Sequence, residues 1–367
     1  MERAVSTSYL GEALLNRSSG LRKALALHFQ YSPETLDIML ESWAPASRTQ
    51  YECYISRWIT FCSKKKIDPF RAEIAQGVEF LVWLFSSLSL GYSAVNTARS
   101  ALSSLLPRRN GTTFGKDPGV SRLLKGIFRL RPSLPRYTVT WDVSIVLTHF
   151  ISLHRSGDNS RKGLTMKLAT LLCLLSGQRS QSLELLKLEC MHLDKSRAIF
   201  YFPVLLKTSR PKFHQAPLEF KAFVMNSVLC PVSCLESYLI LTGRESKESR
   251  TGPLFLSYAH PFLPVKASTI ARYVRTMMKE AGIDTVTFSA HSARGASTSG
   301  VKSKGLSMAH ICKSAGWSGC QTFARHYNKP IQEEDFSSCL LRASVTETVR
   351  TVETLVETVS HDHGTYT

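Results

Sequence analysis

A run of residues near the C-terminal end carries side chains that together suit attack on a phosphodiester. Residues 289–330 read SAHSARGASTSGVKSKGLSMAHICKSAGWSGCQTFARHYNKP and contain His291, Arg294, Trp317 and Tyr327. An arginine presents a planar fork of donors to phosphate oxygens, and a histidine exchanges a proton near neutral pH. A tyrosine can act as a covalent nucleophile. The set indicates transfer of a phosphoryl group to a phenol.

Each of these residues alone has an ordinary explanation, such as a surface pair, a core tryptophan or one structural tyrosine among 12. The combination gains weight from two cations upstream. Arg179 follows the apolar helix LATLLCLLSG, and Lys207 lies in FPVLLKTSRPKF between two strand-like runs. A hairpin turn there would carry Lys207 over a bound phosphate, with Lys212 as the second candidate for that role.

The phrases SGQRSQSL, KTSRP, FRLRPSLPRYTVTWDV and AGW…TF…HYNKP carry a family resemblance. The C-terminal two thirds resembles the tyrosine recombinase (phage integrase) family, most of all the recombinases of DIRS-type and Ngaro-type eukaryotic retrotransposons. The resemblance implies a DNA recombinase that integrates a mobile element through a 3′-phosphotyrosine intermediate and needs no cofactor. The catalytic residues it implies are Tyr327, Arg179, Lys207, His291, Arg294 and Trp317.

One position departs from the family pattern. Many members carry a carboxylate three residues after the first arginine, where it braces the guanidinium. Here that position is Ser182, and Glu184 is the nearest acid.

Composition and charge indicate the kind of partner and compartment. The net charge is +18 and the pI about 9.6, which favours a polyanionic partner, either nucleic acid or an anionic membrane, and we expect double-stranded DNA. Nine scattered cysteines indicate reduced thiols in the cytosol or the nucleus, and of the two we expect a nuclear protein. Their spacing completes no zinc set, so we expect no metal site. The longest apolar runs are far short of a membrane span.

The helical and strand patterns predict a mainly α protein of two domains. We expect an N-terminal arm at 1–30, with one weak helix, and a SAM-like helical core-binding domain at 31–130. A mostly helical catalytic domain with a small antiparallel sheet follows at 137–340, and a tail at 341–367 ends as a disordered segment or a helix docked on a neighbour. The predicted strands are 198–206 and 213–220, and Ser47 and Ser93 are the predicted caps of two N-terminal helices.

The stretch from Arg99 to Arg136 is the most basic, with nine cations against Asp117 alone. Its last residues, 131–136, form a proline-rich linker that cannot continue a helix. This charge excess predicts contact with the DNA backbone. The predicted DNA-binding residues are Arg99, Arg108, Arg109, Arg122, Lys125, Arg129, Arg131 and Arg136, with Arg210 and Lys212 in the catalytic domain.

Two other functions use the same residues. A domesticated DNA-binding protein would keep the fold without the chemistry, and a type IB topoisomerase would cut one strand without paired sites. A recombinase would act on paired sites, and we expect it to assemble as a homotetramer.

Overall fold

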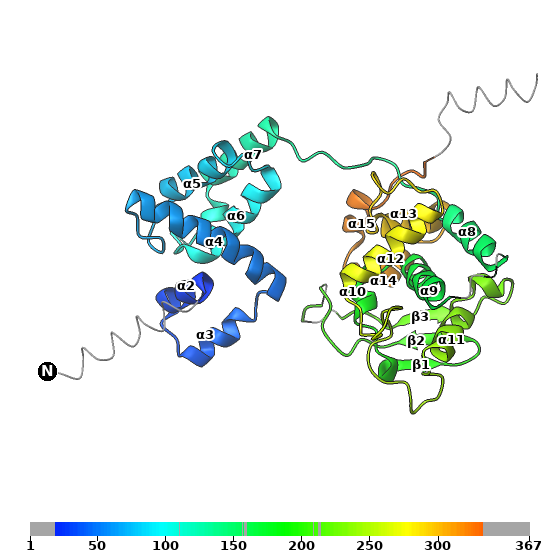
Figure 1. Ribbon diagram of the computed structural model, residues 1–367. Helices are drawn as coiled ribbons and strands as arrows, with labels where there is room; N and C mark the ends of the chain where they lie inside the picture. The colour runs from blue at the N-terminus through cyan, green and yellow to red at the C-terminus, as the bar shows by residue number, and fades with distance from the viewer. Residues whose placement is uncertain are drawn as a thin grey trace, which may run out of the picture. The chain divides into compact units, whose positions relative to one another are not determined.

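The structure is a computed structural model that describes residues 19–109, 111–155, 157, 160–207, 209–211 and 214–332. The chain divides into two compact units, Met1–Pro135 and Arg136–Thr367, each with its own hydrophobic core. Both units are built mainly of helices, and a small antiparallel sheet lies in the second (Figure 1). The predicted fold class is confirmed. Most of the expected N-terminal arm and the whole expected tail lie outside the described residues.

The first unit is a helical bundle closed around aromatic side chains. Trp58 and Phe80 are fully buried, with ring centroids 5.2 Å apart. The buried indole N–H of Trp58 donates to the carbonyl oxygen of Pro69 at 2.8 Å, so its burial leaves no donor unsatisfied. The elements are α2 (Gly20–Phe29), α3 (Pro33–Leu40), α4 (Pro45–Lys65), α5 (Ile74–Ser86), α6 (Tyr92–Leu105), η1 (Phe114–Lys116) and α7 (Pro118–Leu130).

The helical unit begins at Gly20, before residue 31 where the sequence pattern placed its start. Leu21 and Ala24 of α2 are buried in the core. The Glu52 carboxylate of α4 accepts the free backbone N–H groups of Gly20 and Leu21 at 3.0 and 3.1 Å. Long-range capping and burial therefore stabilise a helix whose own sequence signal is weak.

The predicted caps Ser47 and Ser93 are wrong. Helix α4 begins at Pro45, because the first helical position needs no backbone N–H and tolerates proline. Helix α6 begins at Tyr92 behind Gly91. The caps are Ala44 and Gly91, so the two helices start three and two residues earlier than the serine signals suggest.

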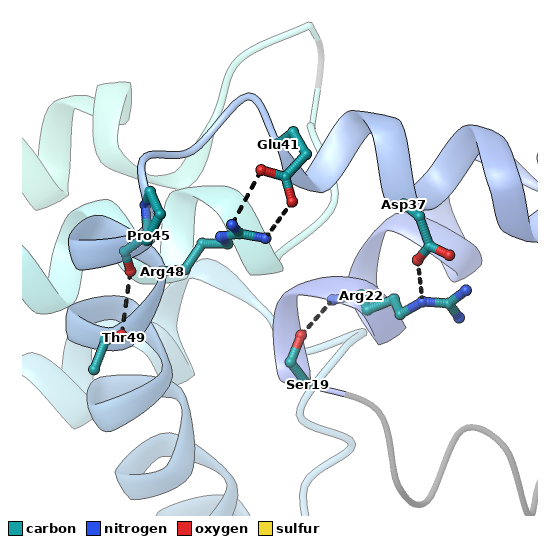
Figure 2. Close-up of polar contacts among 7 residues, drawn as sticks. All are labelled: Ser19, Arg22, Asp37, Glu41, Pro45, Arg48 and Thr49. Carbon is teal, nitrogen blue, oxygen red and sulfur yellow. Dashed lines mark hydrogen bonds and ion pairs between the residues drawn. The ribbon is translucent and has the colours of Figure 1, made fainter. Parts of the chain in front are cut away.

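Two surface ion pairs join the first helices (Figure 2). Arg22 Nε lies 2.8 Å from Asp37 Oδ1, and Arg48 makes two bonds to Glu41 at 2.9 and 3.2 Å. Exposed pairs of this kind contribute little to stability. Their consequence is electrostatic, since they neutralise two of the cations of this unit.

The second unit is arranged around α9 (Arg161–Ser176), most of whose side chains are buried. Helix α9 packs against four other helices and strand β3 (Figure 1). The four helices are α10 (Ser180–Glu184), α11 (Pro231–Leu241), α12 (Ala267–Glu280) and α13 (Ser292–Ser303). The unit also contains α8 (Val143–Arg155), α14 (Met308–Ala315) and α15 (Cys320–His326), with the short turns η2 (Leu188–Cys190) and η3 (Ser227–Leu229).

The sheet is shorter than predicted and has one more strand. Strands β1 (Met191–Leu193), β2 (Arg197–Phe200) and β3 (Leu218–Lys221) pair antiparallel in the order β1-β2-β3. Pro203 and Pro217 lack the N–H that a ladder needs, which limits β2 and β3 to four residues each. Lys207 therefore lies in a long connection and not on a tight hairpin turn.

Candidate active site

The end of α9 sets the first side of the site. Gly177 adopts a left-handed conformation with φ of +60°, and a Cβ there would lie 3.0 Å from Thr298 Cγ2. This turn suits glycine, ends α9 and releases the chain into Gln178 and Arg179. Arg179 precedes α10 with its side chain half-exposed. The sequence SGQR thus places the Arg179 cation just after the buried C-terminal end of α9.

Arg294 lies in the first turn of α13 and is 1% exposed. Its Nη1 donates to Gly177 O at 2.7 Å and its Nη2 to Ala315 O at 2.8 Å. One guanidinium therefore joins the carbonyl ends of α9 and α14. Burial and the nearby Arg179 charge lower the pKa of Arg294 to about 10, which still leaves it protonated at neutral pH.

The Trp317 and Tyr327 rings pack at a tilt of 45° beside this guanidinium. Their ring centroids are 4.8 Å apart, and the Arg294 Cζ lies 4.1 Å from the Trp317 ring centre. Trp317 follows Gly316, whose left-handed conformation ends α14, and Tyr327 follows the last residue of α15. Trp317 is 5% exposed, so it is both a core residue and a wall of the site.

His291 lies 3.0 Å from the nucleophile candidate, measured from its Nε2 to the Tyr327 hydroxyl. Partial burial, and then the charges of Arg294, Arg179 and Lys207, lower the pKa of His291. The imidazole is therefore neutral at pH 7 and can accept a proton at Nε2, provided that its own proton is on Nδ1.

Lys207 and Arg179 line one cavity of about 260 Å³. The cavity opens between α10 and the connection that follows β2, and Gly316 lies on its wall beside Trp317. The structure thus brings together the six residues that the sequence analysis predicted as catalytic. Lys212 lies outside the described residues.

The departure at Ser182 has a structural counterpart. Ser182 is buried, and the Glu184 carboxylate faces α12, where it accepts the Ala267 N–H at 2.9 Å and pairs with Lys266 at 3.7 Å. Glu184 therefore caps α12. The cation beside Arg179 is Arg294, and no acid braces either of them in the described part of the site.

Two buried donors beside Tyr327 have no protein acceptor among the described residues. They are the Nε–H of Arg294 and the indole N–H of Trp317. Buried donors are nearly always bonded, so both of these N–H groups would be stabilised by an acceptor. Gln178 and Gln215 also line the cavity. Gln178 donates to Ser314 O at 2.8 Å, and Gln215 lies against Gly316 on the cavity wall. Neither has a periodicity that singles it out in the sequence.

The sequence pattern of the phage integrase family matches residues 151–334, half of the chain. The chain belongs to the phage integrase family. It is a tyrosine recombinase, an enzyme that cleaves and rejoins DNA. Among curated proteins no relative matches.

Solved structures show the same fold at low identity. The Tn1549 transposon integrase in complex with transposon right end DNA is 15% identical with a TM-score of 0.53, over 89% of this chain and 98% of that one. The XerH site-specific recombinase bound to palindromic difH substrate, a post-cleavage complex, is 15% identical with a TM-score of 0.52, over 86% and 84%. The recombinase fold therefore extends over both units.

The predicted DNA-binding residues of this tyrosine recombinase fall into different environments. Arg122, Lys125 and Arg129 are exposed and recur at helical spacing on α7, so they share a face. Arg99 is half-buried and donates to Gly115 O at 3.1 Å, so it braces η1. The remaining described ones, which are all exposed, are Arg108, Arg109, Arg131, Arg136 and Arg210. Arg131 bonds Leu90 O, and Arg136 bonds Val286 O.

The two hydrogen bonds that Arg294 donates to backbone carbonyls predict a role in stability that Arg179 lacks. A lysine at 294 cannot reach both carbonyl oxygens, and each charge-assisted hydrogen bond is worth about 1.5–3 kcal/mol. Arg294→Lys should lower the free energy of unfolding by roughly 2–3 kcal/mol in denaturant titrations followed by tryptophan fluorescence. Arg179→Lys, at a half-exposed position, is the matched control and should change it by less than about 0.5 kcal/mol. Equal losses in the two variants would contradict the bridging role.

Proposed function

We propose that this tyrosine recombinase integrates a mobile element, cutting each DNA strand with Tyr327 through a 3′-phosphotyrosine link. The observation that carries the proposal is the 3.0 Å contact between His291 Nε2 and the Tyr327 hydroxyl, next to the buried Arg294 guanidinium. The phrases shared with DIRS-type and Ngaro-type recombinases support the mobile-element role and a nuclear location.

The scissile phosphate binds between Arg179 and Arg294. The unpartnered N–H groups of Arg294 and Trp317 supply donors to its non-bridging oxygens, and Arg179 supplies a second cation. Charge on the pentavalent transition state is then stabilised by groups that are already in place. Burial and then the charge of Arg179 lower the pKa of Arg294, and the repulsive part of this effect is relieved when an anion lies between the two guanidinium groups.

The reaction needs two proton transfers, one from the Tyr327 phenol and one to the departing 5′ oxygen. His291 takes the phenol proton as the Tyr327 oxygen bonds to phosphorus, because a phenol with an ordinary pKa of about 10 is a weak nucleophile when protonated. The bond from phosphorus to the 5′ oxygen breaks, and Lys207 protonates the departing oxygen. The product retains a phosphodiester-like bond, so the reverse attack by a 5′ hydroxyl rejoins DNA without another energy source.

Strand exchange requires more than one subunit. We propose that the protein assembles as a homotetramer on paired sites. The tail at 341–367, outside the described residues, carries net charge −2 from residue 342 on and apolar residues that would suit docking on a neighbour.

Tyr327→Phe is expected to bind DNA but to form no covalent adduct, because the ring still packs on Trp317 while the attacking oxygen is absent. A nicked suicide duplex traps the adduct, which denaturing electrophoresis then detects. His326→Ala removes a neighbouring side chain that is exposed and serves as the control. An adduct with the Phe variant would place the nucleophile elsewhere. Adducts with any sequence and no need for paired sites would favour a topoisomerase, and no adduct with the unaltered protein would favour a DNA-binding protein without activity.

Lys207→Ala should be severely slowed on ordinary DNA and recover on DNA with sulfur in place of the bridging 5′ oxygen. A thiolate leaves without a proton, since thiol pKa values are near 8.5, whereas an alkoxide leaves poorly. Rates of adduct formation on the two substrates measure the recovery. Lys212→Ala should show a smaller loss without recovery. Equal impairment of Lys207→Ala on both substrates would mean that Lys207 contacts the backbone and is not the acid.

The basic face of α7 should set part of the salt dependence of DNA binding. Each phosphate contact contributes about 0.9 to the slope of log affinity against log salt, so Arg122→Ala with Arg129→Ala should reduce that slope by about 1.8. The matched control is Arg22→Ala with Arg48→Ala, which also removes two charges, but charges that already pair with Asp37 and Glu41 (Figure 2). The same slope change in both double variants would place the α7 face away from the DNA.

A further inference from the structure

Helix α15 by itself does not determine where the Tyr327 side chain points. The helix ends at His326, and the N–H groups of Tyr327 and Asn328 both donate to Phe323 O at 2.9 Å. Tyr327 is therefore at the point where the chain leaves the helix. The direction of the next few residues, Asn328–Gln332, fixes the backbone that carries the nucleophile, and we call this segment the strap.

The strap is bonded to the first residues of the second unit, Arg136–Trp141, which we call the lead segment. Thr140 N–H donates to Pro330 O at 2.8 Å, and Gln332 N–H donates to Thr140 O at 2.5 Å, as in a single parallel strand bridge. The Lys329 ammonium donates to Tyr137 O and lies 4.1 Å from the centre of the Tyr137 ring. Lys329 thus makes the side-chain part of this contact.

A third element, α13, also holds this backbone. The Ser299 hydroxyl of α13 donates to Tyr327 O at 2.7 Å and accepts the Lys329 N–H at 3.1 Å. Ser299 is 3% exposed, so water does not compete for these bonds. The carbonyl of the nucleophile and the amide of Lys329 are therefore fixed to one buried hydroxyl.

The lead segment also contacts the part of the chain that carries His291. The Trp141 indole N–H donates to Ser292 Oγ at 2.9 Å in a buried contact, and the Tyr137 ring lies 5.1 Å from that of Phe288. Ser292 follows His291 directly. The proton acceptor and the nucleophile are thus positioned against the same few residues, although they lie far apart along the chain.

We propose that Lys329 is a positioning residue for the cleavage reaction: it fastens the strap to the lead segment and so holds the Tyr327 phenol in line with His291 and the phosphate. The proposal rests on the proposed role of Tyr327 as nucleophile. Burial lowers the pKa of Lys329 below that of an ordinary lysine, which fits an ammonium partly withdrawn from water and turned onto a carbonyl and an aromatic face. The Lys329 ammonium interacts with groups of the protein itself, so its role does not require contact with DNA.

The alternative roles of Lys329 make different predictions. A lysine that contacts a phosphate would contribute to DNA affinity and to its salt dependence. A lysine that only stabilises the fold would change the unfolding midpoint and would not separate affinity from rate. A positioning lysine changes the rate of adduct formation in the bound complex and leaves affinity unchanged, because misplacement of a reacting group by about 1 Å can cost on the order of 100-fold.

The test uses the full-length protein and the nicked suicide duplex under single-turnover conditions. Lys329→Met keeps the length of the side chain and loses the charge and donors, and we expect adduct formation slower by about 10- to 100-fold with unchanged dissociation constant and salt slope. Lys329→Arg keeps a cation and donors and should recover most of the rate. Lys304→Met, which removes an exposed lysine at the end of α13, is the matched control and should cleave normally.

Hydrogen exchange gives a readout that is independent of cleavage. In Lys329→Met the amides of Lys329, Gln332 and Thr140 should exchange faster, while amides of α9 remain unchanged. If Lys329→Met does not fold, Ser299→Ala tests the same strap from the α13 side and should show the same separation of rate from affinity.

The outcomes distinguish this proposal from the one on which it rests. If Tyr327→Phe still forms an adduct, the nucleophile has been assigned wrongly. If Tyr327→Phe is inactive but Lys329→Met cleaves at the normal rate, Tyr327 remains the nucleophile and Lys329 does not position it. A loss of affinity with an unchanged rate would make Lys329 a DNA contact, and would also overturn the proposal.

Discussion

One buried guanidinium joins the parts of the site. Arg294 bonds the carbonyl oxygens that end α9 and α14, and these helix ends carry the two turns that lead to Arg179 and Trp317. A carbonyl at a helix C-terminus has no partner within its helix, and a cation there is doubly favourable because the dipole is negative. The same residue that is expected to bind the phosphate thus satisfies the backbone groups that shape the pocket.

This arrangement concentrates positive charge where no acid among the described residues neutralises it. Glu184, the nearest acid in sequence, faces the start of α12. Burial, and then the charge of Arg179, lowers the pKa of Arg294, and burial followed by the charges of Arg294, Arg179 and Lys207 lowers the pKa of His291. Repulsion of this kind is stored in the free protein and released when an anion binds. An anion bound between the two cations would relieve this repulsion. Burial, together with the same charges, lowers the pKa of His291 and so favours the neutral imidazole that can accept a proton.

The second constraint is the direction of the chain after α15. The Tyr327 ring packs on Trp317, but its backbone is held by Ser299 and by the strap against the lead segment. Ring packing restricts the orientation of the Tyr327 side chain, whereas the backbone bonds restrict the position of its Cα. Both are needed to keep a hydroxyl 3.0 Å from an imidazole nitrogen.

Much of the protein follows from local patterns in the sequence. Apolar side chains at helical spacing, such as Ile55, Trp58 and Cys62, predict the helices because burial of one face depends only on nearby residues. The order of Arg179, Lys207, His291, Arg294, Trp317 and Tyr327 indicates the family, since chemistry restricts residue type. What the tertiary structure alone decided are relations between distant stretches. Some of these relations concern single side chains: Glu52 caps α2, Glu184 faces α12, and Lys329 contacts Tyr137. Another is the short strand pairing that leaves Lys207 in a long connection. All of them depend on groups that are far away in the chain. No periodicity records such a contact, because a polar side chain near a helix end can bond any carbonyl that folding brings within about 3 Å.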